Sequence, residues 1–293
     1  MINHYTIILP HYDSLDTLSR AVSSVPDRED IEVLIIDNSR EPIADDLFSE
    51  RRNVSILYSP YGKGAGAARN VGLKHATGKW LLMLDADDFF TEHAFDKMDK
   101  YADSKSDIVF FRTTSCYSDT MQPSNRDRQF NELIEQYHLT GDADCLRYGW
   151  SIPWGKMIRR TLVEAHSIQF EETSVSNDVM FSLLTGYYAD TVAVSDETIY
   201  CATTRQGSLT QTPSLKNIAQ RIDVAIRFNR FMRAHHLPQQ YKKSIMFLIY
   251  TVYQHHGWKN ACRLLIHSIQ SGNNPFIGIS RWGQTIRKIR KNN

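Results

Sequence analysis

The chain of 293 residues predicts an α/β fold, with a mostly parallel, doubly wound sheet and a helical extension at its C-terminal end. Short apolar runs alternate with helical patterns through the first hundred residues, and this alternation is typical of parallel strands joined by helices. From about Leu215 onward the pattern becomes helical. The length allows one large domain or two lobes, with a sizeable core.

The first part of the chain contains five apolar runs with the length and composition of buried strands. Helical patterns fill most of the gaps between them. The expected strands are Tyr5–Pro10, Ile31–Ile36, Val54–Tyr58, Trp80–Leu84 and Ile108–Arg112, and the expected helices are Leu15–Val25, Ala65–Ala76 and Thr91–Tyr101. A polar stretch, Ser115–Arg128, is expected to form a boundary or lid, and two further strands are expected at Thr191–Val194 and Thr198–Thr203.

Composition and charge exclude several classes of protein. The four cysteines are far apart, so neither a zinc site nor a disulfide framework is expected, and a reducing cytoplasm fits. The N-terminus resembles a strand instead of a signal peptide, and the longest later apolar run, Ile245–Tyr253, is too short to span a bilayer. The formal net charge is +1, and nucleic acid is not an expected partner.

Three carboxylates in four positions follow the buried run that begins at Trp80. Carboxylates at the carboxyl end of a parallel strand face the crevice where open α/β sheets bind ligands. The expected partner of Asp85, Asp87 and Asp88 is therefore a divalent cation, Mn²⁺ or Mg²⁺, which itself holds phosphate oxygens. In an extended chain Asp85 and Asp87 would point to one side and Asp88 to the other. The alternative is a solvated loop in which Asp87 or Asp88 caps the helix that begins near Thr91.

The ends of the first two strands carry further residues suited to a nucleoside diphosphate. The first strand is followed by Pro10-His11-Tyr12-Asp13 and the second by Asp37-Asn38-Ser39. A carboxylate such as Asp37 can accept a hydrogen bond from the ring N–H of uracil. An Asx turn that closes the strand is an equally good role for this one residue.

A glycine-rich, basic segment, residues 62–72, lies between the third and fourth strands. Small residues let the N-terminus of a helix approach a ligand closely, and Lys63 and Arg69 add positive charge where phosphate could sit. The segment does not match the Gly-x-Gly-x-x-Gly pattern of a nicotinamide dinucleotide site, because it follows the third strand instead of the first and because Arg69 replaces the last glycine.

Taken in order, four motifs of this chain resemble those of the family 2 glycosyltransferases. That family carries Pro-x-Tyr-Asn after strand one, Asp-Asp-Gly-Ser after strand two, Arg-Asn-x-Gly in a helix and Leu-Asp-x-Asp-Asp after strand four. The matching segments are Pro10-His11-Tyr12-Asp13, Asp37-Asn38-Ser39, Arg69-Asn70-Val71-Gly72 and Leu84-Asp85-Ala86-Asp87-Asp88. The resemblance implies the glycosyltransferase type A fold. It also implies that Asp37 contacts the base and that the acidic motif binds ribose and metal.

The second half of the chain resembles the more variable acceptor half of the family. Residues 154–160 resemble a Trp-Asn-Lys-x-x-Arg-Arg element, and residues 168–172 resemble a Phe-x-Glu element. A Glu-Asp pair follows in the family, and its Asp is the general base; the resemblance assigns this role to Asp178, while Asn177 replaces the usual Glu. At the start of the helix expected over Val179–Tyr187, Asp178 could serve as a cap as well as a base.

The resemblance thus implies a metal-dependent, inverting glycosyltransferase of bacterial surface polysaccharide or lipopolysaccharide synthesis. Its donor would be a nucleoside diphosphate sugar, UDP-linked by preference, and its acceptor a glycan or lipid-linked hydroxyl. The expected parts are a nucleotide-sugar-binding half (1–112), an acceptor-binding half (113–212) and a helical extension (213–293). The expected donor-binding residues are Pro10, Tyr12, Asp13, Asp37, Lys63, Arg69, Asp85, Ala86, Asp87 and Arg205, the last of which precedes a turn that resembles the family's late Gly-Ser turn.

Two alternatives come from other classes. A sugar-phosphate nucleotidyltransferase would also use an α/β sheet, a glycine-rich loop and Mg²⁺, but such enzymes place the loop after the first strand, where this chain has residues 11–13. A catalytically inactive sugar-nucleotide-binding module would have a broken acidic motif or no base candidate. This chain has an intact acidic motif and a base candidate, Asp178.

The basic C-terminal tail is expected to hold the protein at the inner, anionic face of the plasma membrane, as a lipid-linked acceptor would require. The alternative is a solvated, frayed terminus. The expected membrane-binding residues are Phe276, Ile277, Ile279, Trp282, Ile286 and Ile289 on the apolar side, with Arg281, Arg287, Lys288, Arg290 and Lys291.

Overall fold

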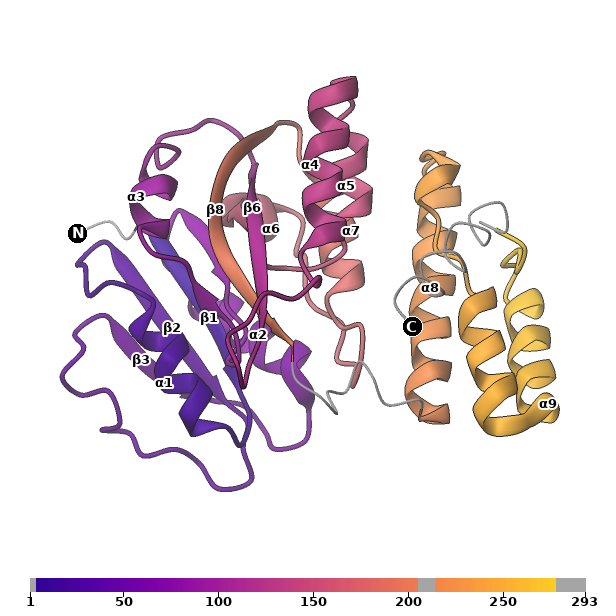
Figure 1. Ribbon diagram of the computed structural model, residues 1–293, viewed down its shortest axis with the longest axis horizontal. Coiled ribbons are helices and arrows are strands. Elements are labelled where there is room, and N and C mark those ends of the chain that lie inside the picture. The colour runs from indigo at the N-terminus through magenta and orange to yellow at the C-terminus, as the bar shows by residue number, and fades with distance from the viewer. Residues whose placement is uncertain (1–3, 205–213, 278–293) are drawn as a thin grey trace. The chain divides into compact units, whose positions relative to one another are not determined.

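The computed structural model describes residues 4–204 and 214–277 of the chain. These residues fall into two compact units, residues 1–208 and residues 209–293, and each unit is described by itself (Figure 1). The predicted site residue Arg205 and most of the predicted membrane tail, residues 278–293, lie outside the described residues.

The first unit is built on one eight-stranded sheet with the strand order β3-β2-β1-β4-β7-β6-β8-β5. β3, β2, β1 and β4 are parallel neighbours, and β6 is parallel to β8, whereas β7 and β5 pair antiparallel with their neighbours. The mostly parallel α/β fold is therefore confirmed. The strands are β1 (Tyr5–His11), β2 (Ile31–Asp37), β3 (Val54–Tyr58), β4 (Trp80–Met83), β5 (Phe89–Phe90), β6 (Ile108–Tyr117), β7 (Lys156–Arg159) and β8 (Val192–Thr204).

The parallel strands place the ends of the predicted motifs at one edge of the sheet. β1 and β2 are buried along nearly their whole length, as expected for strands covered on both faces. The register pairs His11 with Asp37 and Asp37 with Tyr58, so the segments after β1, β2 and β3 begin side by side. β4 joins the same edge next to β1, with Ile8 paired to Met83.

The second half of the sheet differs from the prediction. The strand expected to end at Arg112 continues to Tyr117, because it pairs along its length with β8. The two strands expected over residues 191–203 are one strand, β8, whose register against β6 shifts near Arg112. A β-bulge bends a strand without ending it, and sequence alternation alone does not distinguish a bulge from a turn.

Helices cover the sheet, and α2 is the one that leads into the site. It packs on β1 and β2, and a Cβ atom at Gly72 would lie 2.6 Å from Ile8 Cγ2, so only glycine permits this close approach. The helix expected over residues 91–101 is shorter, Ala94–Asp99. The helices are α1 (Leu15–Ser23), α2 (Gly64–His75), α3 (Ala94–Asp99), α4 (Arg128–Thr140), α5 (Asp144–Gly149), α6 (Arg160–Ala165) and α7 (Val179–Tyr188).

The second unit is the predicted helical extension. It contains α8 (Leu215–Ala234), a short 3₁₀ helix (Gln239–Tyr241) and α9 (Met246–Gln270), which is kinked at Gly257, where φ is 80°. Its core joins apolar residues of α8, among them Ile218 and Ile222, to Val252 and Leu264 of α9. Within the described residues, the helices lack an apolar stretch of the length that a bilayer crossing requires.

Candidate functional site

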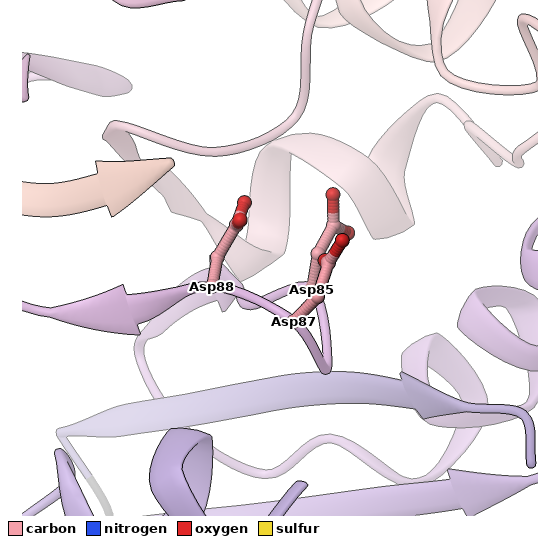
Figure 2. A group of neighbouring side chains, drawn as sticks. All are labelled: Asp85, Asp87 and Asp88. Carbon is pink, nitrogen blue, oxygen red and sulfur yellow. The ribbon is translucent and has the colours of Figure 1, made fainter. Parts of the chain in front are cut away.

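The acidic motif after β4 forms a tight turn. The backbone N–H of Asp88 donates a hydrogen bond to the carbonyl of Asp85 at 3.0 Å, which closes the turn over these four residues. The chain is therefore not extended here, so the alternation of sides expected of an extended chain does not apply to these carboxylates. Oxygen atoms of Asp85, Asp87 and Asp88 all lie within 4.8 Å of one another (Figure 2).

Asp88 is completely buried and anchors this turn to β8. Its Oδ1 accepts a hydrogen bond from the backbone N–H of Thr203 at 2.6 Å, and its Oδ2 accepts one from the Tyr200 hydroxyl at 2.8 Å. The same hydroxyl accepts a hydrogen bond from the Asp85 N–H, and the Tyr200 ring stacks on Trp154 with centroids 4.9 Å apart. Burial and the charge of Asp87 raise the pKa of Asp88 well above its usual value. Tyr200 thus braces both ends of the turn.

Asp87 is the exposed member of the group. Desolvation and the neighbouring charge of Asp85 raise the pKa of Asp87. Among the described residues its carboxylate is hydrogen bonded only by its own backbone N–H, whereas both oxygens of Asp88 accept hydrogen bonds from β8. Carboxylate oxygens are the ligands that Mg²⁺ and Mn²⁺ prefer, so this group fits a hard divalent cation held by Asp87 and Asp85, with Asp88 at the buried side.

Arg69 connects this turn to the segment before α7. It lies in α2 and is 5% exposed, and its Nη2 forms an ion pair with Asp85 Oδ1 at 2.5 Å. Its Nη1 donates a hydrogen bond to Asn177 Oδ1 at 2.8 Å, and its guanidinium lies over the Phe170 ring. The buried Nε has no partner among the described residues. One cation therefore bridges the acidic turn and the segment before α7.

Asn70, the next residue of α2, binds the backbone of the same segment through its side chain. Its side-chain amide donates to the carbonyl of Phe170 at 3.0 Å and accepts from the Phe170 N–H at 2.8 Å. Gly66 permits this contact, because a Cβ atom there would lie 2.1 Å from the carbonyl oxygen of Glu171. The Arg69-Asn70 pair thus docks α2 against residues 170–177.

Asp178 stands at the N-terminus of α7, next to Asn177. It occupies the capping position of the helix, but its side chain makes no capping hydrogen bond. Burial raises the pKa of Asp178, while the charge of Arg69 lowers it, Asp85 raises it and Lys156 lowers it. The charged groups that act on this carboxylate are therefore Arg69, Asp85 and Lys156.

Lys156 is a buried cation beneath the same helix. It lies in β7, is 2% exposed, and its Nζ is 3.4 Å from Ser182 Oγ, one turn after Asp178. Burial lowers the pKa of its ammonium group to about 7, against the opposing effect of Asp178. The sequence placed Lys156 inside a family-like element without assigning it a role.

A second buried network closes the ends of β1 and β2. His11 Nδ1 lies 2.9 Å from Asp37 Oδ1, and His11 Nε2 accepts a hydrogen bond from the Ser14 N–H. This arrangement assigns the proton of a neutral His11 ring to Nδ1. Burial acts to raise the pKa of Asp37, but hydrogen bonds from Ser39, His11 and the Ile43 N–H hold it below its usual value. Nothing in the sequence reasoning assigned His11 a role of its own.

The remaining predicted donor residues surround this network. Pro10 is buried in β1, while Tyr12 is exposed and stacks on Tyr61 with ring centroids 6.2 Å apart. Asp13 has a positive φ of 48°, and its N–H donates to Ser39 Oγ. The other members of the predicted set are Lys63, exposed in the position before α2, and Ala86, half-buried in the acidic turn.

Arg126 is a site residue that the sequence reasoning missed. It belongs to the polar stretch expected to be a boundary or lid, which instead is hydrogen bonded to β6 and β8 through Ser115, Ser124 and Thr203. Its Nη1 lies 3.6 Å from Asp88 Oδ1, and its guanidinium lies over the Trp154 ring. A lone arginine in a polar stretch carries no local signal of such a contact.

Comparison with known families decides the class of this protein. Residues 6–166 match the family described as glycosyl transferase family 2. The chain belongs to this family. It is a glycosyltransferase, as the four motifs predicted, and the matched segment contains the acidic turn and Arg69 but ends before Asp178.

Individual glycosyltransferases extend the similarity. The uncharacterized glycosyltransferase EpsJ of Bacillus subtilis is 26% identical over 90% of this chain and 73% of its own length. The poly(ribitol-phosphate) beta-N-acetylglucosaminyltransferase TarS of Staphylococcus aureus is 25% identical over 69% of this chain and 36% of its own length. The crystal structure of S. aureus TarS 1–349 in complex with UDP-GlcNAc has the same fold, with a TM-score of 0.67 over 92% of this chain and 81% of that chain, at 19% identity.

Proposed function

We propose that this glycosyltransferase moves a sugar from a UDP-linked donor to a hydroxyl of a glycan or lipid-linked acceptor in bacterial surface polysaccharide synthesis, with inversion at the anomeric carbon. The division of labour follows the sequence expectation: residues 1–112 bind the donor, residues 113–212 bind the acceptor, and residues 213–293 form the helical extension. The observation that carries the proposal is the Asp178 carboxylate, which makes no capping hydrogen bond to its helix. Its neighbour in sequence, Asn177, is hydrogen bonded to Arg69, which in turn forms an ion pair with Asp85 of the acidic turn.

Asp178 is the proposed general base. A base needs a free lone pair to take a proton from an attacking hydroxyl, and the side chain of Asp178 makes no capping hydrogen bond to its helix. Its raised pKa brings the carboxylate nearer to neutral pH, where it both stays ionised and accepts a proton more readily. Because the carboxylate takes the proton of the acceptor hydroxyl and does not itself attack the sugar, the nucleoside diphosphate leaves in a single displacement, which inverts the anomeric carbon.

The acidic turn is the proposed site of the donor diphosphate and its metal. Asp87 and Asp85 would hold Mn²⁺ or Mg²⁺, with Asp88 at the buried side, and the cation would supply positive charge to the leaving diphosphate. Arg69 holds Asp85 in place through their ion pair, and the exposed Lys63 at the start of α2 adds positive charge for phosphate. Arg205 is proposed for the same diphosphate.

The pocket for the base is proposed at the ends of β1 and β2. Uracil offers a ring N–H that a carboxylate accepts, and Asp37 is held ionised by its neighbours. Its Oδ1 already accepts hydrogen bonds from His11 and Ser39, whereas Oδ2 accepts one from the Ile43 N–H, so Oδ2 is the oxygen proposed to receive the uracil N–H. Pro10, Tyr12 and Asp13 line this end, with the exposed Tyr12 and Tyr61 rings available for stacking. The UDP and UDP-GlcNAc bound to S. aureus TarS support this donor class.

A screen of nucleotide sugars tests the proposal. The full chain is incubated with UDP-, GDP- and dTDP-sugars and Mn²⁺, and released nucleoside diphosphate is measured with and without simple glycan acceptors. Release from a UDP-sugar is expected. Release of pyrophosphate from UTP and a sugar phosphate would instead indicate a nucleotidyltransferase, and binding without turnover by any donor would indicate an inactive module.

A further inference from the structure

The net charge of the whole chain is near zero, but its two units carry net charges of opposite sign. Residues 209–293 contain fourteen Lys and Arg residues and a single acidic residue, Asp223, whereas residues 1–208 contain twenty basic and thirty-two acidic residues. Asp223 is itself paired with His267 at 2.8 Å. A unit so strongly basic attracts anionic surfaces at long range, and the rest of the chain does not.

One face of α9 combines this charge with exposed apolar side chains. After the kink at Gly257, Ala261, Leu264 and Ser268 are buried on the inner side of the helix. The opposite side presents Trp258, Ile266 and Ile269, which are 63%, 54% and 53% exposed. Positions 258, 262, 266 and 269 recur every three or four residues, so their side chains share one side of the helix. We call the exposed side formed by Trp258, Lys259, Cys262, Arg263, Ile266 and Ile269 the α9 face.

Basic residues border the apolar part of the α9 face. Lys259 follows Trp258 and Arg263 follows Cys262, each one position along the helix, so both lie at the edge of the apolar stripe. α9 contains no Asp or Glu residue, and neither Lys259 nor Arg263 forms an ion pair within the part of the chain that the structure describes. Trp258, Ile266 and Lys259 line a shallow surface hollow together with Arg263.

We propose that the α9 face docks onto an anionic lipid surface, and this deepens the proposed function because it brings the site to a lipid-linked acceptor. Interfacial helices combine Trp and aliphatic residues with Lys and Arg, so that rings and methyl groups sink to the acyl boundary while cations contact headgroups. Phe247, Tyr250 and Tyr253 of the first half of α9 are also exposed. Aromatic rings of this kind favour the bilayer interface.

The combination of exposed apolar and basic side chains on the α9 face favours a membrane over other anionic partners. A soluble polyanion would be bound by the basic residues alone, and exposing Trp258 and Ile266 would then cost solubility without adding affinity. A second copy of the chain would bring another basic unit against this one, and the two would repel each other.

The test uses the full chain and phosphatidylcholine vesicles with and without phosphatidylglycerol, in the absence of donor and acceptor, so that its outcome does not depend on catalysis. The protein is expected to sediment with the anionic vesicles only, and added salt should weaken binding. K259Q/R263Q should lower the partition coefficient about thirtyfold, because each basic residue near such a surface contributes about fivefold. W258S/I266S should also lower it. The matched controls K74Q and L139S, on exposed residues of the first unit, should bind as the unchanged protein does.

Cys262 provides a readout that needs no substitution. It is the exposed one of the four cysteines and lies on the α9 face, so an environment-sensitive fluorophore attaches there selectively. A blue shift on anionic vesicles is expected. The proposal is overturned if the label reports no change while the protein binds, if both double variants bind like the unchanged chain, if polyphosphate binds and vesicles do not, or if W258S/I266S converts a dimer to a monomer without affecting vesicles.

Discussion

Arg69 Nη2 lies 2.5 Å from Asp85 Oδ1, and the ion pair joins α2 to the acidic turn at the end of β4. The same guanidinium donates a hydrogen bond to Asn177, the residue before the proposed base Asp178. Arg69 therefore links the proposed metal-binding turn to the segment that contains the proposed base.

Replacing Asp178 by Asn should lower turnover by at least about a hundredfold and leave donor affinity nearly unchanged, because a general base acts in the transition state. Turnover is measured by nucleoside diphosphate release and affinity by calorimetry with the unreacted donor. The product of the unchanged enzyme should have the inverted anomeric configuration by NMR, and retention would contradict the single displacement. Loss of donor affinity in the variant would assign Asp178 to donor binding instead.

Replacing Asn177 by Glu should move the acidic limb of the pH–rate profile to higher pH. The new carboxylate would stand next to Asp178 and would engage Arg69, so it would both repel the charged form of the base and weaken the cation that lowers the pKa of Asp178. The control is Asn177→Gln, which adds the same length without charge. An acidic limb that moves to lower pH would contradict the proposed electrostatics.

Replacing Asp87 by Ala should abolish Mn²⁺-dependent donor binding and leave the fold intact. Removal of an exposed carboxylate from a crowded acidic group relieves repulsion, so the metal-free variant should unfold at the same temperature or higher. Thermal shifts with and without Mn²⁺ and UDP measure both effects. The control is Asp103→Ala, whose side chain is 99% exposed in the first unit. Unchanged Mn²⁺ dependence in the Asp87 variant would show that the metal binds elsewhere.

Replacing Tyr200 by Phe should destabilise the chain by about 1–3 kcal/mol, because buried Asp88 would lose a hydrogen-bond donor while its Oδ2 stays away from water. Mn²⁺ affinity should fall as well, because the Asp85 N–H loses its acceptor and the acidic turn is held less firmly. Chemical denaturation measures the stability, and Tyr117→Phe, at an exposed position, is the control. A variant as stable as the unchanged chain would contradict the role of this hydrogen bond.

Replacing Lys156 by Met should flatten the dependence of stability on pH between about pH 7 and 10. The pKa of this amine is about 7 in the folded chain and 10.5 when it is solvated, so the unfolded state binds more protons in that window and stability rises with pH there. The contribution is at most about 1.4 kcal/mol per pH unit. Denaturation of both chains across the window measures the difference, which Lys74→Met at an exposed position should not show. Equal slopes would mean that Lys156 is solvated.

The sequence by itself determined the class of fold and which segments of the chain form the proposed site. Apolar runs with helical patterns between them predicted the parallel strands, because burial on both faces demands such runs. Since parallel strands all end at one edge, the residues after Pro10, Ile36 and Leu84 could be expected to lie together before any contact was known. The motifs also identified the family correctly.

Only the tertiary structure decided which of these side chains meet. Arg69 and Asn177 are 108 residues apart, and Asp88 and Tyr200 are 112 apart, so their contacts depend on register and packing angles that local patterns do not encode. The turn at Asp85–Asp88 is one result: the partners on β8 hold Asp88 inside, where an extended chain would have pointed it away. Sequence periodicity reports which face of an element is buried, whereas the identity of the neighbour across that face is a property of the folded chain.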